Sequence, residues 1–477
     1  MLWIEVGAAF LIGLALRFVV NLEPVWWLAW FVPGLLFALA LRAGNWRGRG
    51  LVALAALIGV TVNVPLFAQF MPMPILVLVM TLMTLLWVLV MGTARRIVLA
   101  FDSRWTILAL PVVAVAVDTL LAHFTPDGNW GSLAYTQAEV LPVAQLAAVF
   151  GVGGILFVLM LANSALAFAL TYGVQGRGAP ITYVSIGLVA ALTVAFGYWR
   201  LSMPATGTAV TFGIASVDDF IGDAASEHSR AVWQRYDVQV RELAGKGAKQ
   251  VLLPEKIGVL APADAEIRKT QLALLAREQG VWLTAGLGVD NGTEKRNEAW
   301  VFAPDGRLVT NYLKHFLAPP ERDFVSGTEF PVNEIEGVNY GVAICKDMHF
   351  ASLGRGFGER GAGVMFVPAW DFDADDWMAA NMTKLRGVEN GYTIVRASRN
   401  GLLSISDSYG RMLAVERSKA LPGTTLLATV NVGARVPTIY THIGDLLGWI
   451  CVGVFAVLLP WSLVRSRRSK PTIRIAV

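Results

Sequence analysis

Charged residues are scarce in this 477-residue chain. They make up 16% of it, against about 25% in ordinary soluble proteins, and the mean hydropathy is +0.55. This composition excludes a wholly soluble globular protein. The scarcity is uneven, because residues 51–91 contain no charged side chain, whereas residues 218–435 are as charged as a soluble domain. The sequence therefore predicts a membrane protein that also carries a water-exposed domain.

Cysteine is nearly absent as well, since the chain has only Cys345 and Cys451. Cys451 lies in an apolar stretch near the C-terminus and is typical of inert packing in a membrane helix. Cys345 lies in the charged region. One cysteine in the membrane and one outside it exclude an internal disulfide framework. Nothing in the sequence indicates a metal site, and we expect no metal and no cofactor.

Eight apolar stretches are long enough to cross a membrane as helices, which takes roughly 20 residues. Seven of them precede residue 200, and the eighth lies near the C-terminus. They are residues 2–20, 25–41, 51–70, 74–91, 106–121, 141–170, 181–199 and 446–464. We therefore predict a bundle of about eight transmembrane helices, with an N-terminal part over residues 1–200 and a C-terminal helix over residues 440–466.

Arginines gather in alternate loops between these stretches. Arg42 and Arg49 follow the second stretch, Arg95 and Arg96 follow the fourth, and the tail 467–477 is basic. The positive-inside rule then places both termini in the cytoplasm and the segment between the seventh and eighth stretches on the outer side of the cytoplasmic (inner) membrane. This topology accounts for the net charge of +4, so we expect no nucleic-acid partner.

Residues 208–432 change to short β-branched runs that alternate with helical stretches and Gly/Asp/Asn turns. Strands are predicted at 208–216, 249–254, 281–289, 297–304, 307–314, 338–345, 363–370, 392–398, 402–408 and 411–416, and helices at 264–279 and 375–388. Asp305 and Gly306 form a hairpin signal between two of these strands. The pattern favours a single extracytoplasmic α/β domain.

Three reactive side chains stand at the ends of predicted strands in this domain. Glu255 ends "QVLLPE", Lys314 ends "RLVTNYLK" and Cys345 ends "NYGVAIC". Each alone is more typical of a strand terminus or of core packing. Together they supply what a cysteine nucleophile needs, because a thiol attacks as thiolate. Glu255 can take its proton, and Lys314 can lower the thiol pKa or stabilise an oxyanion together with a backbone N–H.

The order "LLPE", "YLKHFLAP", "GVAIC.D" resembles the Glu–Lys–Cys triad of the nitrilase (carbon–nitrogen hydrolase) superfamily. The resemblance implies an α-β-β-α sandwich and a thioester on Cys345, with Glu255 as general base and Lys314 as oxyanion-stabilising cation. It also implies supporting roles for Glu321 and Asp347.

Apolar spans before and after such a domain resemble one branch, apolipoprotein N-acyltransferase. Three segments are similar to that branch: "NWGSLAYTQAEVLPVAQLAAVFGVGGILFVLMLANSALA", "KLRGVENGYTIVRASRNGLLSISDSYGR" and "TIYTHIGDLLGW". The branch implies a phospholipid acyl donor and an amine acceptor such as the N-terminal diacylglyceryl-cysteine of a lipoprotein. In the loop at the first segment, Trp130 and Tyr135 are either interface aromatics or contacts for lipid or substrate.

Two features depart from that branch. Lys346 stands where the family has an aromatic residue and would place a second cation beside the nucleophile, and the segment between Lys314 and Cys345 is short. Both favour the alternative of a membrane-anchored nitrilase-type amidase, in which water resolves the thioester. A transporter or receptor whose outer domain only binds a ligand is a third reading, which the triad and the nearly uncharged spans disfavour. We predict the N-acyltransferase.

Overall fold

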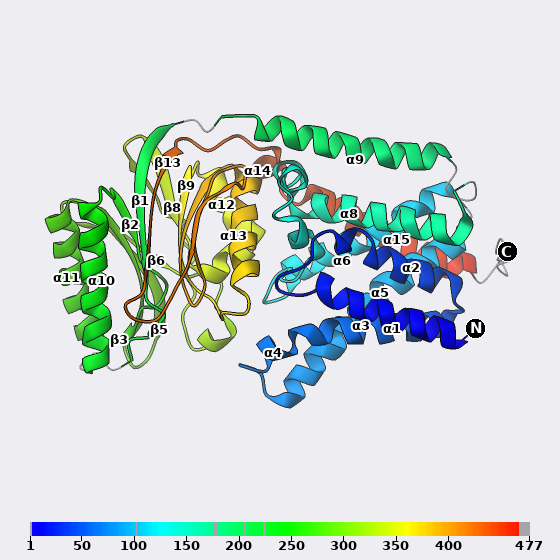
Figure 1. Ribbon diagram of the computed structural model, residues 1–477, viewed down its shortest axis with the longest axis horizontal. Coiled ribbons are helices and arrows are strands. Elements are labelled where there is room, and N and C mark those ends of the chain that lie inside the picture. The colour runs from blue at the N-terminus through cyan, green and yellow to red at the C-terminus, as the bar shows by residue number, and fades with distance from the viewer. Residues whose placement is uncertain (1, 102, 175–179, 205–206, 223–225, 467–477) are drawn as a thin grey trace. The chain divides into compact units, whose positions relative to one another are not determined.

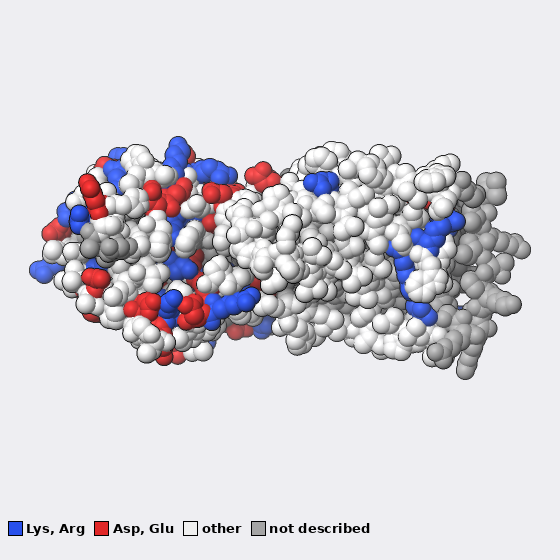
Figure 2. All heavy atoms as spheres, turned by 90° about the horizontal axis from the view of Figure 1, so that it is seen from below, with Lys and Arg blue, Asp and Glu red and all other residues white. Residues whose placement is uncertain are grey.

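The computed structural model describes residues 2–101, 103–174, 180–204, 207–222 and 226–466. The chain divides into two compact units, one formed by Met1–Arg200 with Ile443–Val477 and the other by Leu201–His442 (Figure 1). The tail 467–477, predicted to be cytoplasmic, lies outside the described residues. Figure 2 shows that charged side chains crowd the surface of the α/β unit and are sparse on that of the helical unit, as expected for surfaces that face water and lipid.

The first unit is helical. Its α-helices are α1 (Leu2–Val19), α2 (Val32–Arg42), α3 (Asn45–Val60), α4 (Val64–Phe67), α5 (Met73–Ala100), α6 (Ala109–Phe124), α7 (Leu141–Ala144), α8 (Ala147–Tyr172), α9 (Pro180–Leu201) and α15 (Leu446–Ser466). Short 3-10 turns are η1 (Leu28–Trp30), η2 (Thr61–Asn63), η3 (Arg104–Leu108) and η4 (Leu133–Gln137).

Among the described residues, seven helical segments are long and apolar enough to cross a membrane. The predicted stretch 25–41 instead forms the shorter apolar segment Leu28–Arg42, so the prediction of about eight helices holds with one short member. Close packing occurs where α2 meets α8. The backbone N–H of Gly34 donates to Asn163 Oδ1 at 2.6 Å, and a side chain at position 34 would collide with the Asn163 backbone. Small residues allow such approaches between membrane helices.

The second unit is α/β, with 3-10 turns η5 (Pro319–Glu321) and η6 (Cys345–His349). Its strands are β1 (Thr208–Ser216), β2 (Gln250–Leu252), β3 (Val259–Leu260), β4 (Trp282–Asp290), β5 (Lys295–Phe302), β6 (Leu308–Leu313), β7 (Val332–Ile335), β8 (Val338–Val342), β9 (Val364–Trp370), β10 (Thr393–Arg399), β11 (Leu402–Ser406), β12 (Met412–Arg417) and β13 (Thr424–Val432). Its helices are α10 (Glu227–Gly245), α11 (Pro262–Gln279), α12 (Ala351–Glu359), α13 (Asp376–Asn390) and α14 (Ile439–Ile443).

These strands form two sheets packed face to face. The first has the order β13-β1-β2-β4-β5-β6 with β3 beside β4, and the second has the order β12-β11-β10-β9-β8-β7. Apolar side chains of both sheets, among them Phe212 and Phe366, share one buried cluster. A second cluster joins the first sheet to α10 and α11, and Figure 1 shows α12 and α13 beside the second sheet. The expected α-β-β-α sandwich is thus confirmed.

Strand direction explains why distant residues meet. β1, β2 and β4 are parallel, β5 reverses, and β6 reverses again, so β2, β4 and β6 end at one edge of their sheet. β8, β9 and β10 are parallel in the other sheet. Polar groups just beyond parallel strand ends are held on rigid supports. Each of the three predicted site residues comes shortly after the end of one strand: Glu255 after β2, Lys314 after β6 and Cys345 after β8.

Candidate active site

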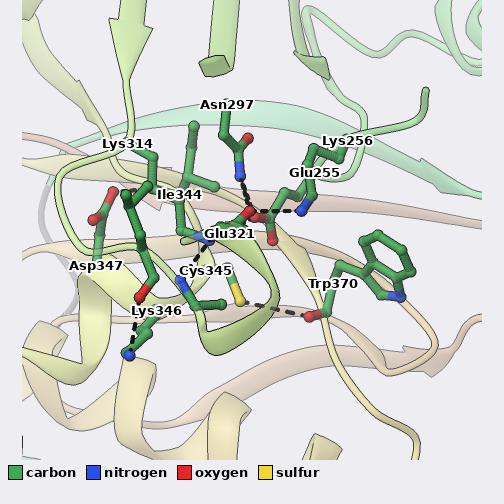
Figure 3. Close-up of polar contacts among 12 residues, drawn as sticks. Glu255, Lys256, Asn297, Lys314, Glu321, Ile344, Cys345, Lys346, Asp347 and Trp370 are labelled. Carbon is green, nitrogen blue, oxygen red and sulfur yellow. Dashed lines mark hydrogen bonds and ion pairs between the residues drawn. The ribbon is translucent and has the colours of Figure 1, made fainter. Parts of the chain in front are cut away.

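A buried ion cluster lies at this sheet edge (Figure 3). Lys314 Nζ is 2.7 Å from Glu255 Oε1 and 2.8 Å from Glu321 Oε2. Lys256 Nζ is 2.6 Å from Glu321 Oε1. Asn297 Nδ2 donates to both carboxylates, at 2.6 Å to Glu255 and 2.7 Å to Glu321. Two ammonium groups therefore balance two carboxylates inside the domain, as buried charges require.

The local backbone shapes this cluster. Glu255 follows β2, and a side chain at Gly286 on the neighbouring β4 would lie 2.5 Å from the Pro254 carbonyl oxygen. Only glycine at that position lets the segment before Glu255 approach β4 so closely. Glu321 ends η5 and also accepts the Ala318 backbone N–H at 2.8 Å.

The electrostatics favour the charged forms of Lys314 and Glu321. Burial by itself disfavours the charged form of Lys314, but the carboxylates of Glu255 and Glu321 outweigh it and raise the pKa of this ammonium above its ordinary value. Burial likewise opposes ionisation of Glu321, yet Lys314 and Lys256 lower its pKa to about 2. Opposite charges within a few ångströms act in this direction. Lys314 is thus a permanent cation, and Glu321 a permanent anion.

Cys345 begins η6 and is partly buried. Its φ is 45°, a left-handed conformation that non-glycine residues rarely adopt, and such strain gathers at functional sites. Its Sγ contacts the Trp370 carbonyl oxygen at 3.6 Å (Figure 3). Burial, and then the Glu255 carboxylate, raise the pKa of the thiol well above its usual range, although Lys314 opposes them. The resting thiol is therefore protonated at neutral pH and needs a base to react.

Asp347 fixes the turn that carries Cys345. Its carboxylate accepts the Ile344 backbone N–H at 2.9 Å and the Tyr312 hydroxyl at 2.7 Å. It also accepts the backbone N–H groups of His315 at 3.1 Å and Phe316 at 2.8 Å. Asp347 thereby ties the cysteine turn to the segment that follows Lys314, and its role here is positional.

Lys346 does not stand beside the sulfur. Its side chain is buried, and its Nζ donates to the Leu317 carbonyl oxygen at 3.0 Å. In Figure 3 the ammonium points to the opposite side of the turn from the Cys345 sulfur. The sequence led us to expect a second cation next to Cys345. In the structure the Lys346 ammonium instead binds the Leu317 carbonyl oxygen, because the side chains of Cys345 and Lys346 leave the turn in different directions.

Trp370 and Arg399 form an aromatic and cationic wall beside the cysteine. The Arg399 guanidinium lies 3.6 Å from the Trp370 ring centroid, and Phe220 stacks on the same ring at 5.8 Å. Arg399 is fully buried, and none of its three guanidinium nitrogens has a hydrogen-bond partner among the described residues. Burial lowers its pKa to about 10. Trp370 thus belongs to this wall and also provides the backbone carbonyl oxygen that the Cys345 thiol contacts.

Sequence reasoning missed Asn297, Lys256 and Tyr312. Asn297 lies within β5 on its buried side, where a polar residue among apolar neighbours is a weak signal for a buried network. Lys256 directly follows Glu255, and nothing local indicates its ion pair with Glu321.

The aromatic residues of the predicted outer loop belong to the helical unit. Tyr135 is fully buried, and its hydroxyl donates to Asn129 Oδ1 at 2.9 Å. Asn129 in turn donates to Asp118 at 2.9 Å. Trp130 packs edge-on against Phe67, with ring centroids 5.7 Å apart.

In the part of the chain that the structure describes, no group of three or more His, Cys, Asp or Glu side chains could hold a metal ion.

Comparison with known proteins gives two family matches that together cover most of the chain. Residues 8–165 match the apolipoprotein N-acyltransferase N-terminal domain, and residues 226–423 match the carbon-nitrogen hydrolase family. The apolipoprotein N-acyltransferase of Geobacter metallireducens is 25% identical over 390 residues, 74% of this chain and 73% of its own. That of Bradyrhizobium diazoefficiens is 24% identical over 422 residues, 77% of this chain and 75% of its own.

Relatives of a second kind match a smaller share of the chain. The omega-amidase of Homo sapiens is 28% identical over 182 residues, 33% of this chain and 65% of its own. Among solved structures, an amidase from Nesterenkonia sp. is similar at 19% identity and a TM-score of 0.42, covering 48% of this chain and 92% of that one. The two long matches include the helical unit as well as the α/β unit, so the chain as a whole is similar to apolipoprotein N-acyltransferases, and its residues 226–423 match the carbon-nitrogen hydrolase family.

Proposed function

We propose that this protein is a membrane N-acyltransferase that takes an acyl group from a phospholipid onto Cys345 and passes it to an amine. The favoured acceptor is the N-terminal diacylglyceryl-cysteine of a lipoprotein. The observation that carries this proposal is the union in one chain of the N-acyltransferase helical unit, matched over residues 8–165, with a hydrolase domain that holds an intact Glu255–Lys314–Cys345 set.

In the first step Glu255 accepts the thiol proton, and the thiolate attacks the carbonyl carbon of the phospholipid ester. The carbonyl oxygen of the ester becomes an oxyanion, which the Lys314 ammonium and the backbone N–H of Lys346 stabilise. When the tetrahedral intermediate collapses, the C–O bond breaks, and Glu255 returns its proton to the leaving lysophospholipid alcohol. The acyl group is left on Cys345 as a thioester.

In the second step the acceptor amine attacks the thioester carbonyl. Glu255 takes a proton from the amine, the same cation stabilises the oxyanion, and the C–S bond breaks as the amide forms. The departing thiolate recovers the proton, and the resting thiol is restored. The raised pKa of the Cys345 thiol supports this route, because a protonated nucleophile needs the adjacent base in every cycle.

We keep supporting roles for two acidic residues. Glu321 is the second carboxylate that holds Lys314, and Asp347 positions the turn of Cys345. For Lys346 we propose a structural role through its side chain, since its ammonium binds the Leu317 carbonyl. A lipid contact at Trp130 or Tyr135 remains a prediction.

The topology belongs to this proposal. Residues 208–432 would form the catalytic domain on the outer (periplasmic) side, with residues 1–200 and 440–466 in the inner membrane and both termini, with the tail 467–477, in the cytoplasm. Arginines in alternate loops support this orientation. It suits the chemistry, because a phospholipid donor and a lipid-anchored amine both reside in the outer leaflet.

A membrane-anchored amidase is the second candidate, in which water resolves the thioester. The 28% identity to an omega-amidase over 182 residues favours it. So does the short stretch between Lys314 and Cys345, which is occupied by η5, β7 and β8.

Labelled phospholipid separates the two functions. The full chain in membranes receives a phospholipid with a labelled acyl chain, together with a peptide that carries an N-terminal diacylglyceryl-cysteine. We expect an acyl adduct on Cys345 by intact mass and label in the peptide amide. Cys345→Ala removes both, whereas Cys451→Ala, the matched control, keeps both. Label found only as free fatty acid, with no amide product, would overturn the transferase in favour of hydrolysis.

A further inference from the structure

The helical unit has a partly open cavity of about 240 Å³, which is lined by residues of α2, α3 and α5. A single water molecule needs only about 10–15 Å³ of such space, so the cavity admits a group of several atoms. Arg49, Arg95 and Arg96 line it together with Asn45 and Gly92, and none of the described residues that line it is Asp or Glu. The cavity is therefore cationic, in a unit whose surface is otherwise sparse in charge (Figure 2).

Helical spacing directs these residues to one place. On α5, positions 92, 95 and 96 are three and four residues apart and share a face. On α3, positions 45 and 49 are four apart and share a face in the same way. Both faces line the one cavity, which lies near the C-terminal end of α5 and the N-terminal end of α3.

The environment of Arg95 favours the binding of an anion in the cavity. It is 8% exposed, and it donates to the backbone carbonyl oxygens of Ala40 at 2.6 Å and Ala43 at 2.8 Å, and to Asn45. These acceptors satisfy its N–H groups and hold α5 against the end of α2, but they are uncharged. Among the described residues Arg95 has no carboxylate partner. Burying a cation without a counter-ion costs free energy. An anion bound in the cavity would act as the counter-ion of Arg95.

We propose that this cavity binds a phosphate group, favouring that of a phospholipid headgroup. The planar guanidinium fork matches phosphate oxygens in pairs, and basic pockets between membrane helices bind anionic headgroups. The cavity lies at the ends of two helices that are long and apolar enough to cross a membrane, where such headgroups reside. The site is independent of the proposed thioester chemistry and stabilises the helical unit.

Gly92 provides a sharp test of the cavity. A Cβ at position 92 meets no atom within 4 Å, so Gly92→Leu adds its side chain at the cavity wall from a position with free space around the Cβ. The double variant Arg49→Gln/Arg96→Gln removes charge and leaves Arg95 to hold the helices. Two matched controls lie outside the lining. Gly50→Leu adds the same side chain to an open position of α3, and Arg104→Gln removes an exposed arginine.

Binding of dihexanoyl phosphatidylglycerol to the full chain in detergent, followed by native mass spectrometry, decides the proposal. We expect the wild type and both controls to bind this lipid in preference to dihexanoylglycerol, which lacks phosphate. Gly92→Leu and the double arginine variant should bind at least about tenfold more weakly, as expected from the loss of a charge-assisted contact.

Inorganic phosphate distinguishes the source of the ligand. If it displaces the lipid at matched ionic strength, the phosphate alone is recognised; if it does not, the site requires the headgroup on its glycerol. Either outcome supports the phosphate site. Equal binding of dihexanoylglycerol, or undiminished binding in both cavity variants, would overturn it.

Discussion

Removing the charge of Glu321 is the most direct test of the ion cluster. Glu321→Gln leaves the ammonium groups of Lys314 and Lys256 with one carboxylate, Glu255, so the buried cluster gains a net positive charge. The Glu321 pKa of about 2 lies about 2.5 below the ordinary value of 4.5. At about 1.4 kcal/mol per pKa unit, this corresponds to about 3 kcal/mol of folding free energy. Breaking a buried ion pair typically costs about 3–5 kcal/mol, in agreement.

The dependence on pH has a definite sign. Because folding lowers the pKa of Glu321, its contribution is fully present above about pH 4.5 and is lost as the pH falls toward about 2. Wild-type protein should therefore lose stability over this acid range. Glu321→Gln should start about 3 kcal/mol less stable at pH 7 and show a correspondingly shallower acid slope.

Pulse proteolysis of the full chain in urea, in detergent, measures the unfolding free energy of the α/β unit at each pH. Glu329→Gln is the matched control, because it makes the same exchange at an exposed position of the same segment and should shift the free energy by less than about 0.5 kcal/mol. Acyl transfer should also fall in Glu321→Gln, since Lys314 loses one of its two anchors. The reasoning is refuted if Glu321→Gln is as stable as Glu329→Gln and keeps the wild-type acid slope.

Three further predictions concern the nucleophile and its support. The Asp347 carboxylate accepts hydrogen bonds from the Tyr312 hydroxyl and from three backbone N–H groups, and Asp347→Asn removes one of its acceptor atoms. The free energy of unfolding in urea should therefore fall by about 2–3 kcal/mol, and formation of the acyl adduct on Cys345 should slow. Because the Cys345 thiol pKa is raised, its alkylation by iodoacetamide, followed by mass spectrometry, should still accelerate above pH 9; a plateau near pH 8.5 would contradict this. Gly391 has a φ of 75°, and a methyl group added there in Gly391→Ala would collide with the Val436 carbonyl oxygen. This substitution should lower the free energy of unfolding by at least about 2 kcal/mol.

The strands that deliver the site were predictable because their patterns are local. The predicted strand at 208–216 matches β1 at both ends, and those at 307–314 and 363–370 match β6 and β9 within one residue at each end. Buried runs that end abruptly in a charged or reactive residue drew attention to Glu255, Lys314 and Cys345. The ion pair between Glu255 and Lys314 follows from strand direction, which a βαβ pattern partly encodes.

What the sequence hid depends on contacts between distant segments. β13 was not predicted, and it gains its place by pairing with β1 over 200 residues earlier, as in Thr208 with Val432. Asn297 is polar within a strand, and only the three-dimensional cluster shows that its amide bridges two carboxylates. The orientation of the Lys346 ammonium depends on the tight turn after β8, which residue type does not reveal.

The ion cluster also explains how one lysine can serve both steps of the proposed mechanism. Lys314 contacts two carboxylates that differ in function: Glu321, with its pKa of about 2, stays ionised, whereas Glu255 takes up the thiol proton. Protonation neutralises Glu255 at the moment when negative charge develops on the substrate oxygen. The positive charge that Glu255 had balanced then stabilises the oxyanion, and Glu321 holds the ammonium in place. Net charge in the buried site stays constant through the step, so attack proceeds without the cost of creating an unpaired charge in a medium of low dielectric.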